Sequence, residues 1–290
     1  MNNQVRIRFF FSQYTSTGLR NAVCSTFAVK DFQFKHIKFV DDETYTHAVI
    51  INCYTFKMEP KIKKLPKRNV LGLAWEPPIL LSKSDTVKDF AKKRIGKFLV
   101  GHSMKDFPKC YVNYYGFITH LPVQPKPDKT QFMSIIVSNK RQLHGHIYRH
   151  MLILEILKTD LNIHIYGRGA NKYNDDRVKG DFTRDEPYKN YTHTIAIENK
   201  QYNHYISEKF SSPIALNCIP IYLGCPNVKN YFGKDCHIKL TGDVKNDIKL
   251  LHDIFNNKDK YLLNLDTARN HILNGKASLP VFLSKYWKQK

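Results

Sequence analysis

The chain lacks a long hydrophobic run. Nowhere does it hold the roughly 18 uncharged apolar residues that a helix needs to cross a bilayer. Its first residues, "MNNQVRIRFFFSQYTS", lack the apolar core and small-residue cleavage site of a secretion signal, because Arg8 interrupts the apolar run at 7–11. We therefore expect a chain with neither a leader nor a membrane anchor, located in the cytoplasm.

Cysteine is also scarce. Six cysteines in 290 residues are too few for a disulfide scaffold, and no CxxC pair suggests a zinc site. Their neighbours are mostly core-type residues, which favours a reducing compartment. The six are Cys24, Cys53, Cys110, Cys218, Cys225 and Cys236.

Acidic residues are few beside basic ones, 25 against 46, which gives a formal charge of +21. Such a charge favours anionic partners: nucleic acid, a membrane surface or phosphate-bearing substrates. The abundance of Lys, Asn, Ile and Tyr is equally what an A/T-rich genome produces, and the lysines are spread over the whole chain. The densest group is "KMEPKIKKLPKR" (57–68), which is either a solvated surface or a binding patch. With charge as the only signal, no nucleic-acid partner is expected.

Short apolar runs alternate with helical patterns. With 42% hydrophobic residues the chain can bury a substantial core. Near-continuous apolar runs are typical of parallel strands that are covered on both faces. Helices are expected between them, at 146–159, 207–218 and 243–257. The expected strands are "VRIRFFF" (5–11), "HAVIINC" (47–53), "NVLGLAW" (69–75), "KFLVGH" (97–102), "FMSIIVSN" (132–139), "LNIHIYG" (161–167), "HTIAIEN" (193–199) and "IPIYLG" (219–224).

The alternation predicts two α/β domains. Between them "HLPVQPKPDKTQ" (120–131) carries three prolines and no periodicity, as a linker does. The predicted domains are residues 1–125 and 126–290, the second including a C-terminal helical segment.

The stretch "IAIENKQYNHYISEKF" (195–210) joins a strand end to a helix start. Ligands of open α/β sheets bind at such places, where helix N-termini present free N–H groups. Ser207 would cap the helix, Lys209 adds a charge suited to a diphosphate, and Glu208 can accept two sugar hydroxyls. Tyr205 can stack or donate a hydrogen bond. The alternative is a Ser-capped helix with two exposed charges.

A second candidate cation stands upstream, near the start of the helix that follows "VSNKRQLHG" (137–145). Arg149 there can bind a phosphate through two hydrogen bonds. Alternatively it is an ordinary surface charge of the helix.

The order "IAIEN…YISEKF…IPIYLG-P", after "VSN…R…YG", resembles the α-1,3-fucosyltransferases of glycosyltransferase family 10. Members have a strand ending in Glu-Asn, then a Tyr-(Ile or Val)-(Ser or Thr)-Glu-Lys helix start, and a strand ending in Gly-x-Pro. The match spans residues 132–232, about a third of the chain. It implies a GT-B-like α/β fold, with two Rossmann-like domains facing across a cleft. The implied activity is inverting transfer of L-fucose from GDP-fucose to a GlcNAc-type glycan acceptor, with an α-1,3 linkage.

The resemblance also assigns roles within the donor site. Glu208 contacts the fucose and Lys209 the diphosphate, while Asn199 and Tyr205 belong to the donor pocket. Arg149 lies near the family's phosphate-binding arginine but one residue out of register. The fallback for that role, Arg141, is therefore kept open.

The general base is expected in the first half, where "NVLGLAWEPPILL" (69–81) ends a strand at Glu76. Glu76-Pro77-Pro78 matches the family's Glu-x-Pro tripeptide, whose glutamate is the proposed base. An inverting transfer needs one carboxylate to take the acceptor's proton, and cations can neutralise the diphosphate leaving group. The alternative is a glutamate that merely ends a buried strand.

No cofactor is required by this scheme beyond the donor substrate. "VDDE" (40–43) and "NDD" (174–176) do not form a DxD metal motif, so a divalent metal is not expected. Other nucleotide sugars, a non-catalytic sugar-binding module and a nucleic-acid binder remain as alternatives. The acceptor, the linkage and the oligomeric state stay open.

Overall fold

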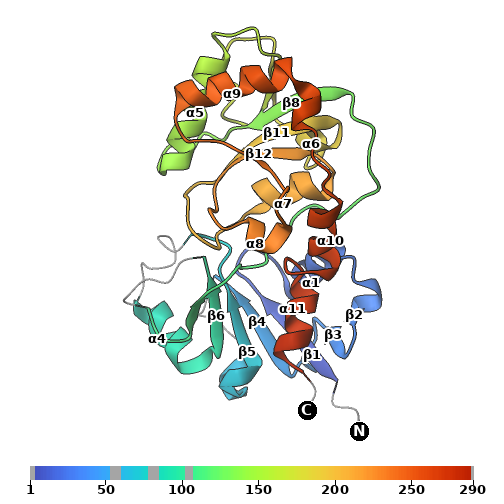
Figure 1. Ribbon diagram of the computed structural model, residues 1–290. Coiled ribbons are helices and arrows are strands. Elements are labelled where there is room, and N and C mark those ends of the chain that lie inside the picture. Colours follow the sequence, from blue (N-terminus) through green and yellow to red (C-terminus); the bar gives the residue numbers. More distant parts are fainter. Residues whose placement is uncertain (1–3, 53–59, 78–84, 102–106, 289–290) are drawn as a thin grey trace. The chain divides into compact units, whose positions relative to one another are not determined.

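The computed structural model describes residues 4–52, 60–77, 85–101 and 107–288 (Figure 1). The chain divides into two compact units. Unit 1 comprises residues 1–119, 202–205 and 273–290, and unit 2 comprises residues 120–201 and 206–272. Each unit is a sheet with helices packed against it, so the α/β class expected from the alternating pattern is confirmed.

Unit 1 is built on a sheet in the order β2-β3-β1-β4-β5-β6-β7. Its neighbouring strands run parallel, except β2 against β3. The strands are β1 Val5–Phe10, β2 Gln33–Phe34, β3 Ile37–Phe39, β4 His47–Ile51, β5 Val70–Leu73, β6 Lys97–Val100 and β7 Tyr111–Asn113. The helices include α1 Ser16–Thr26, α2 Pro60–Lys64, α4 Asp85–Arg94 and α11 Leu279–Tyr286, with 3-10 turns at Lys30–Phe32 and Lys67–Asn69.

Unit 2 has a parallel sheet in the order β10-β9-β8-β11-β12-β13. The chain builds outward from β8 to one side and then returns to the other, which is the Rossmann strand order with its switch point between β8 and β11. The strands are β8 Gln131–Ile136, β9 Ile163–Tyr166, β10 Val178–Gly180, β11 Tyr191–Ile197, β12 Ile219–Leu223 and β13 Ile238–Lys239. The helices include α5 His144–Ile156, α6 Glu186–Lys189, α7 Glu208–Ala215, α8 Lys229–Phe232, α9 Val244–Asn256 and α10 Asp266–Asn274, with a 3-10 turn at Lys258–Tyr261.

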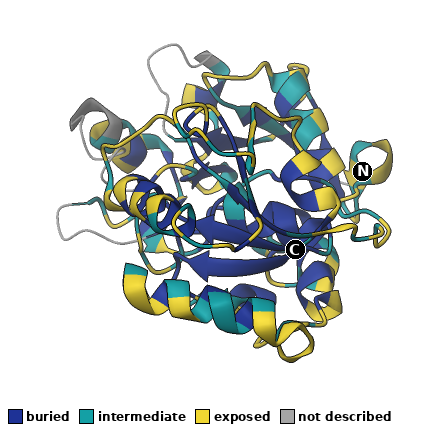
Figure 2. Ribbon diagram, turned by 90° about the horizontal axis from the view of Figure 1, so that it is seen from above, coloured by how far each residue is buried: buried dark blue, intermediate teal, exposed yellow. Residues whose placement is uncertain are grey.

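Apolar side chains cover both faces of the unit 2 sheet. On one face, α5 and α9 pack residues such as Leu152 and Leu251 against β8, β9, β11 and β12. A separate cluster joins Tyr188, Tyr191 and Leu216. Figure 2 shows the resulting arrangement, with buried strands between helices whose outer sides are exposed. The strands are apolar along their length because neither face meets water.

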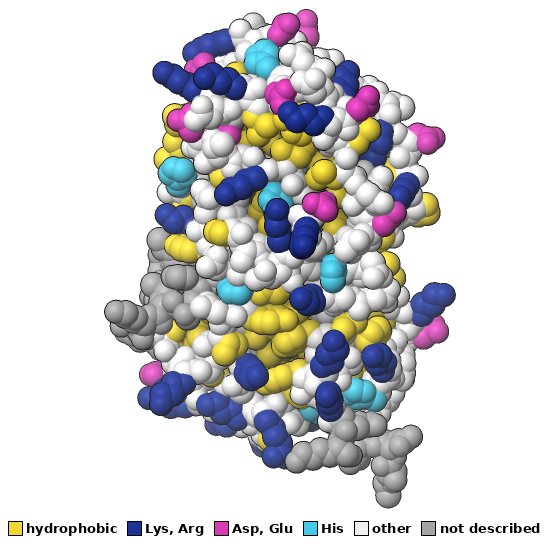
Figure 3. Space-filling view, viewed as in Figure 1, with side chains coloured by type: hydrophobic (Ala, Val, Ile, Leu, Met, Phe, Trp, Pro, Cys, Tyr) yellow, Lys and Arg dark blue, Asp and Glu magenta, His cyan; other side chains and the backbone are white. Residues whose placement is uncertain are grey.

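The outer surface carries the charge. Lys and Arg side chains are more frequent than Asp and Glu on the face drawn in Figure 3, as the net charge of +21 requires. Among the described residues, no helix combines the length and the apolar character needed to cross a membrane.

The division of the chain differs from the expected domains in three places, of which one is the short segment 202–205, which belongs to unit 1. Unit 2 begins at His120 rather than at residue 126, and residues 273–290 belong to unit 1 rather than to the C-terminal domain. The indole of Trp287 donates to the carbonyl of Arg68 (3.0 Å), and His36 Nε2 hydrogen-bonds to the Trp287 carbonyl (2.8 Å). These contacts, with the Phe282 ring 5.4 Å from that of Tyr114, hold α11 on unit 1.

Replacing Trp287 by Ala removes a buried ring and its hydrogen bond, so the free energy of unfolding of unit 1 should fall by about 3–5 kcal/mol. Hydrogen exchange should then accelerate at the backbone amides of β1, β4 and β5 and stay unchanged in β8 and β11. Acceleration confined to β8 and β11 would instead assign this segment to unit 2.

Candidate functional site

A pocket of about 320 Å³ opens at the switch point of unit 2, between the carboxyl ends of β8 and β11. Parallel Rossmann-type sheets bind their ligands at this position, because the loops part there and leave a crevice. The ends of the two strands, the first turns of α5 and α7, and the loop around Arg184 line it. Four of the predicted site residues are among the lining: Arg149, Asn199, Glu208 and Lys209.

Helix α7 starts as the sequence predicted. Ser207 has an extended backbone, and its hydroxyl accepts a hydrogen bond from the Lys209 N–H (3.3 Å), as an N-cap does. Glu208 and Lys209 occupy the first turn and form an ion pair of 2.8 Å. The pKa of Lys209 is lowered by burial but raised more by Glu208 and Glu198, so it ends above its ordinary value. Lys209 is therefore charged at neutral pH.

Glu198 anchors this turn from the end of β11. Its buried carboxylate accepts hydrogen bonds from the Ser207 N–H (2.7 Å), the Ser207 hydroxyl (2.6 Å) and the Tyr222 hydroxyl (3.2 Å). Burial raises the pKa of Glu198 although Lys209 opposes the shift. Gly224 must be a glycine here, since a Cβ would lie 2.5 Å from Glu198 Cγ. Glu198 thus holds the site together rather than lining it.

Arg149 is buried rather than a surface charge of its helix. Its guanidinium donates to the carbonyl of Ile197 (2.6 Å) and to Asn199 Oδ1 (3.3 Å). The first turn of α5 contacts the residues that follow β11: the Gly145 N–H donates to the Asn199 carbonyl (3.2 Å). A Cβ at Gly145 would come within 1.8 Å of the Glu198 carbonyl, so only glycine permits this approach. Arg141, the alternative cation, is exposed and is not among the lining residues.

The pocket contains further polar residues that the sequence patterns did not indicate. Lys140 follows β8, and Arg184 precedes α6; both are exposed side chains that line the pocket. His146 is buried, and burial together with the nearby cations lowers its pKa to about 4, so it is neutral at pH 7. The ring of Tyr188 also lines the pocket, and burial raises the pKa of its phenol.

The charges of the pocket favour an anion. Four cations line it, Lys140, Arg149, Arg184 and Lys209, against the single carboxylate of Glu208. The N-terminal end of α7 adds the partial positive charge of its helix dipole. A doubly charged group such as a diphosphate would complement this balance, and Glu208 beside it could accept hydroxyls.

The remaining two predicted residues belong to unit 1. Tyr205 is buried and packs on Gly101, where a Cβ would lie 2.7 Å from Tyr205 Cβ. Glu76 is exposed and follows β5. The N–H groups of Trp75 and Glu76 donate to Asn52 Oδ1 (2.7 and 3.2 Å), which fixes the turn after the strand. Glu76 therefore stands at the carboxyl edge of the unit 1 sheet; its partner Pro78 in the tripeptide lies outside the described residues.

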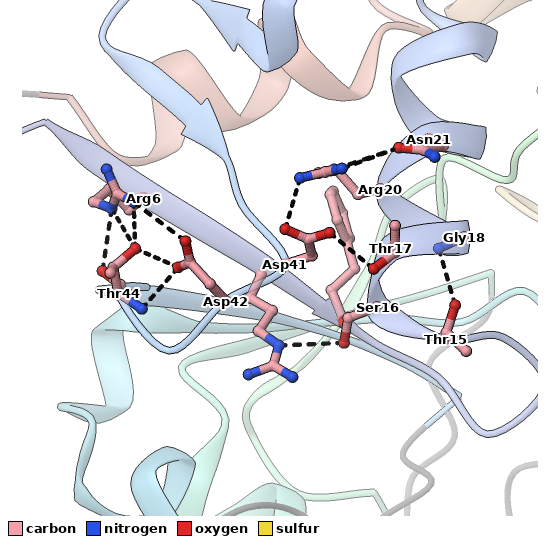
Figure 4. Close-up of polar contacts among 12 residues, drawn as sticks. Arg6, Thr15, Ser16, Thr17, Gly18, Arg20, Asn21, Asp41, Asp42 and Thr44 are labelled. Atoms are coloured by element: carbon pink, nitrogen blue, oxygen red, sulfur yellow. Dashed lines mark hydrogen bonds and ion pairs between the residues drawn. The ribbon is translucent and has the colours of Figure 1, made fainter.

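The acidic loops weighed as metal motifs are paired with cations. Asp41 accepts hydrogen bonds from Arg20 (2.7 Å) and Thr17 (2.8 Å), and Asp42 accepts from the Thr44 N–H (2.8 Å), as Figure 4 shows. In the second loop Asp175 pairs with Arg177 at 2.8 Å. Over the described part of the chain, no group of three or more His, Cys, Asp and Glu side chains could hold a metal ion.

Comparison with known proteins shows a family match over most of unit 2, the unit that contains the pocket. The sequence profile described as "Glycosyltransferase family 10 (fucosyltransferase) C-term" matches residues 126–267. The match covers slightly less than half of the chain. The profile spans the family 10 motifs that the sequence resemblance rested on, from β8 through α7 to β12 and α8.

Two curated relatives agree with the family 10 match. A "putative fucosyltransferase-like protein" of Arabidopsis thaliana is 26% identical over 178 residues, 60% of this chain and 31% of that protein. "Alpha-(1,3)-fucosyltransferase B" of Drosophila melanogaster is 33% identical over 87 residues, 29% of this chain and 19% of that protein. The chain thus spans about a third or less of the length of the curated relatives that it matches.

A solved structure extends the likeness to the whole chain. A crystal structure of an alpha1,3-fucosyltransferase is 13% identical and has a TM-score of 0.52, covering 99% of this chain and 91% of that one. At this identity the likeness concerns the fold, and it confirms the GT-B-like class.

Replacing Glu198 by Ala leaves the Ser207 N–H, the Ser207 hydroxyl and the Tyr222 hydroxyl without their shared acceptor. We expect the free energy of unfolding to fall by about 3 kcal/mol, since buried donors lose a charged partner. Tyr222→Phe removes one of these bonds and the hydrogen bond that the Tyr222 hydroxyl accepts from the Cys225 N–H (3.0 Å), and should cost about 1–2 kcal/mol. Urea unfolding curves give both values. Equal costs for the two variants would contradict the central place of Glu198.

Proposed function

We propose that the chain is an inverting glycosyltransferase that moves L-fucose from GDP-fucose to a hydroxyl of a GlcNAc-type acceptor, in an α-1,3 linkage. The observation that carries the proposal is the pocket of unit 2, which lies in the family 10 match and combines four cations with one carboxylate at a Rossmann switch point. The relatives named fucosyltransferases support the choice of fucose.

The donor would bind through its two charged parts. Arg149 and Lys209 hold the diphosphate. The partial positive charge at the start of α7 and the loop cations Lys140 and Arg184 add to the attraction. Glu208 accepts hydroxyls of the fucose, and Asn199 lines the pocket beside it. A donor-binding role for Tyr205, which is buried in unit 1 and does not line this pocket, stays a prediction. The hydrogen bonds of Arg149 to β11 support this role, because they fix its guanidinium before the ligand arrives.

In the transfer step, Glu76 takes the proton of the acceptor hydroxyl. The acceptor oxygen forms a bond to the anomeric carbon of fucose from the face opposite the nucleotide, the bond from that carbon to the diphosphate oxygen breaks, and GDP leaves with the electron pair. Lys209 and Arg149 offset the charge that develops on the leaving diphosphate. No metal ion is required in this scheme, because these cations neutralise the leaving group. The expected cytoplasmic location stays a prediction.

Isothermal titration of the purified protein with GDP-fucose, GDP-mannose and UDP-GlcNAc tests the donor. We expect GDP-fucose to bind most tightly, and Lys209→Ala to weaken that binding about 10- to 100-fold, because a charged hydrogen bond to phosphate is lost. Lys245→Ala, an exposed lysine outside the pocket, should leave the affinity unchanged. Preferred binding of another sugar nucleotide would retain the site and reject fucose, and binding of none would favour a non-catalytic module.

Replacing Glu76 by Gln tests the base. The turnover number should fall by about 100-fold or more, because the amide cannot take the acceptor's proton, while the affinity for the donor stays within about twofold. Asp89→Asn, which removes another exposed carboxylate of unit 1, serves as the control and should leave turnover unchanged. Wild-type turnover in Glu76→Gln would remove Glu76 from the mechanism.

A further inference from the structure

Two lysine-rich segments of unit 1 fold against each other, residues 61–68 and residues 92–97. The Lys67 ammonium donates to the carbonyl of Lys92 (2.7 Å), and the guanidinium of Arg94 donates to the carbonyl of Lys63 (2.6 Å). Gly96 lies so close that a Cβ there would be 2.7 Å from the Lys67 carbonyl oxygen. We call the cations of these two segments the basic edge: Lys61, Lys63, Lys64, Lys67, Arg68, Lys92, Lys93, Arg94 and Lys97.

Among the described residues, no ion pair joins a carboxylate to a cation of the basic edge. Residues 61–68 and 92–97 contain no Asp or Glu. In the described part of unit 1, carboxylates form ion pairs with other arginines, Arg6, Arg8 and Arg20, and with no cation of the basic edge. Seven of its nine side chains are exposed, while Lys61 and Arg94 are half-buried. The fold therefore holds a concentrated positive charge in contact with water.

The basic edge is separate from the candidate site. Its two segments lead into β5 and β6, which are parallel neighbours, so they lie at the edge where these strands begin. Glu76 follows the other end of β5, at the carboxyl edge. Lys and Arg side chains also predominate over the face of unit 1 that Figure 3 displays. The proposed function uses none of these cations.

We propose that the basic edge docks unit 1 on an anionic membrane surface. Seven of its nine cations are lysines, which act as compact point charges, and a cluster of this size is attracted by acidic headgroups without any specific pocket. Nucleic-acid recognition instead favours the forked guanidinium of arginine and aromatic stacking platforms. The basic edge has two arginines, of which Arg94 is bound to a backbone carbonyl, and neither segment contains an aromatic residue. This inference does not depend on the proposed transfer reaction.

Flotation with lipid vesicles tests the docking. The whole chain should bind vesicles of phosphatidylcholine that contain about 30 mol% phosphatidylserine, and should not bind vesicles of pure phosphatidylcholine. Raising the NaCl concentration from about 0.05 to 0.3 M should release the bound protein. The variant Lys63→Gln, Lys64→Gln, Lys92→Gln and Lys93→Gln should bind at least about 100-fold more weakly. These four side chains are exposed and make no ion pair with another described residue, so circular dichroism and thermal unfolding should match the wild type.

A matched variant separates the patch from the overall charge. Lys189→Gln, Lys234→Gln, Lys245→Gln and Lys249→Gln remove the same four charges from exposed positions of unit 2. Its vesicle binding should change by less than about fivefold. Equal loss in the two variants, or binding that ignores salt and phosphatidylserine, would overturn the proposal. Tighter binding to a DNA duplex than to the vesicles, lost in the first variant, would reassign the basic edge to nucleic acid.

Discussion

The buried carboxylate of Glu198 is the constraint on which the candidate site depends. It ends β11 and accepts three hydrogen bonds, two from Ser207 and one from Tyr222, so that the start of α7 and the end of β12 are tied to the same strand. Leaving a carboxylate in the core is costly, and these bonds offset that cost. The network fixes the position of Glu208 and Lys209, which follow Ser207 directly in the chain. The turn that carries them cannot shift without breaking these hydrogen bonds.

The two units fix the turn that follows a central strand with different side chains. In each, a parallel sheet places loops at the carboxyl ends of its strands, and a side chain from a neighbouring element fixes the decisive turn. Unit 2 uses the Glu198 carboxylate, and unit 1 uses the amide of Asn52, which accepts from the N–H groups of Trp75 and Glu76. A neutral amide suffices in unit 1 because that turn is only partly buried. In unit 2 the three buried donors, two hydroxyls and one backbone N–H, require a carboxylate as their shared acceptor.

The sequence predicted eight strands, the Ser207 cap and the family resemblance because each of these is written in consecutive residues. It missed β2, β3, β7, β10 and β13, whose two or three residues are too few to show a pattern. Apolar runs, a capping serine and a helix start are local signals. It could not predict that α11 belongs to unit 1, since an apolar helix face does not specify which core it covers. Lys140 and Arg184 were missed for a similar reason: they are exposed loop cations in a chain full of lysine, and only the folded loops bring them to one pocket. The close approach of Gly145 to β11 is likewise a contact between residues distant in sequence.

A crystal structure with GDP-fucose bound would test the account most directly. We expect the diphosphate at the switch point between β8 and β11, with its oxygens within hydrogen-bond distance of Arg149 and Lys209 and the Glu208–Lys209 ion pair opened toward the ligand. A diphosphate bound at the end of β12 instead, beside Lys229 and Lys239, would contradict it. In that case the anchored turn of α7 would hold no donor.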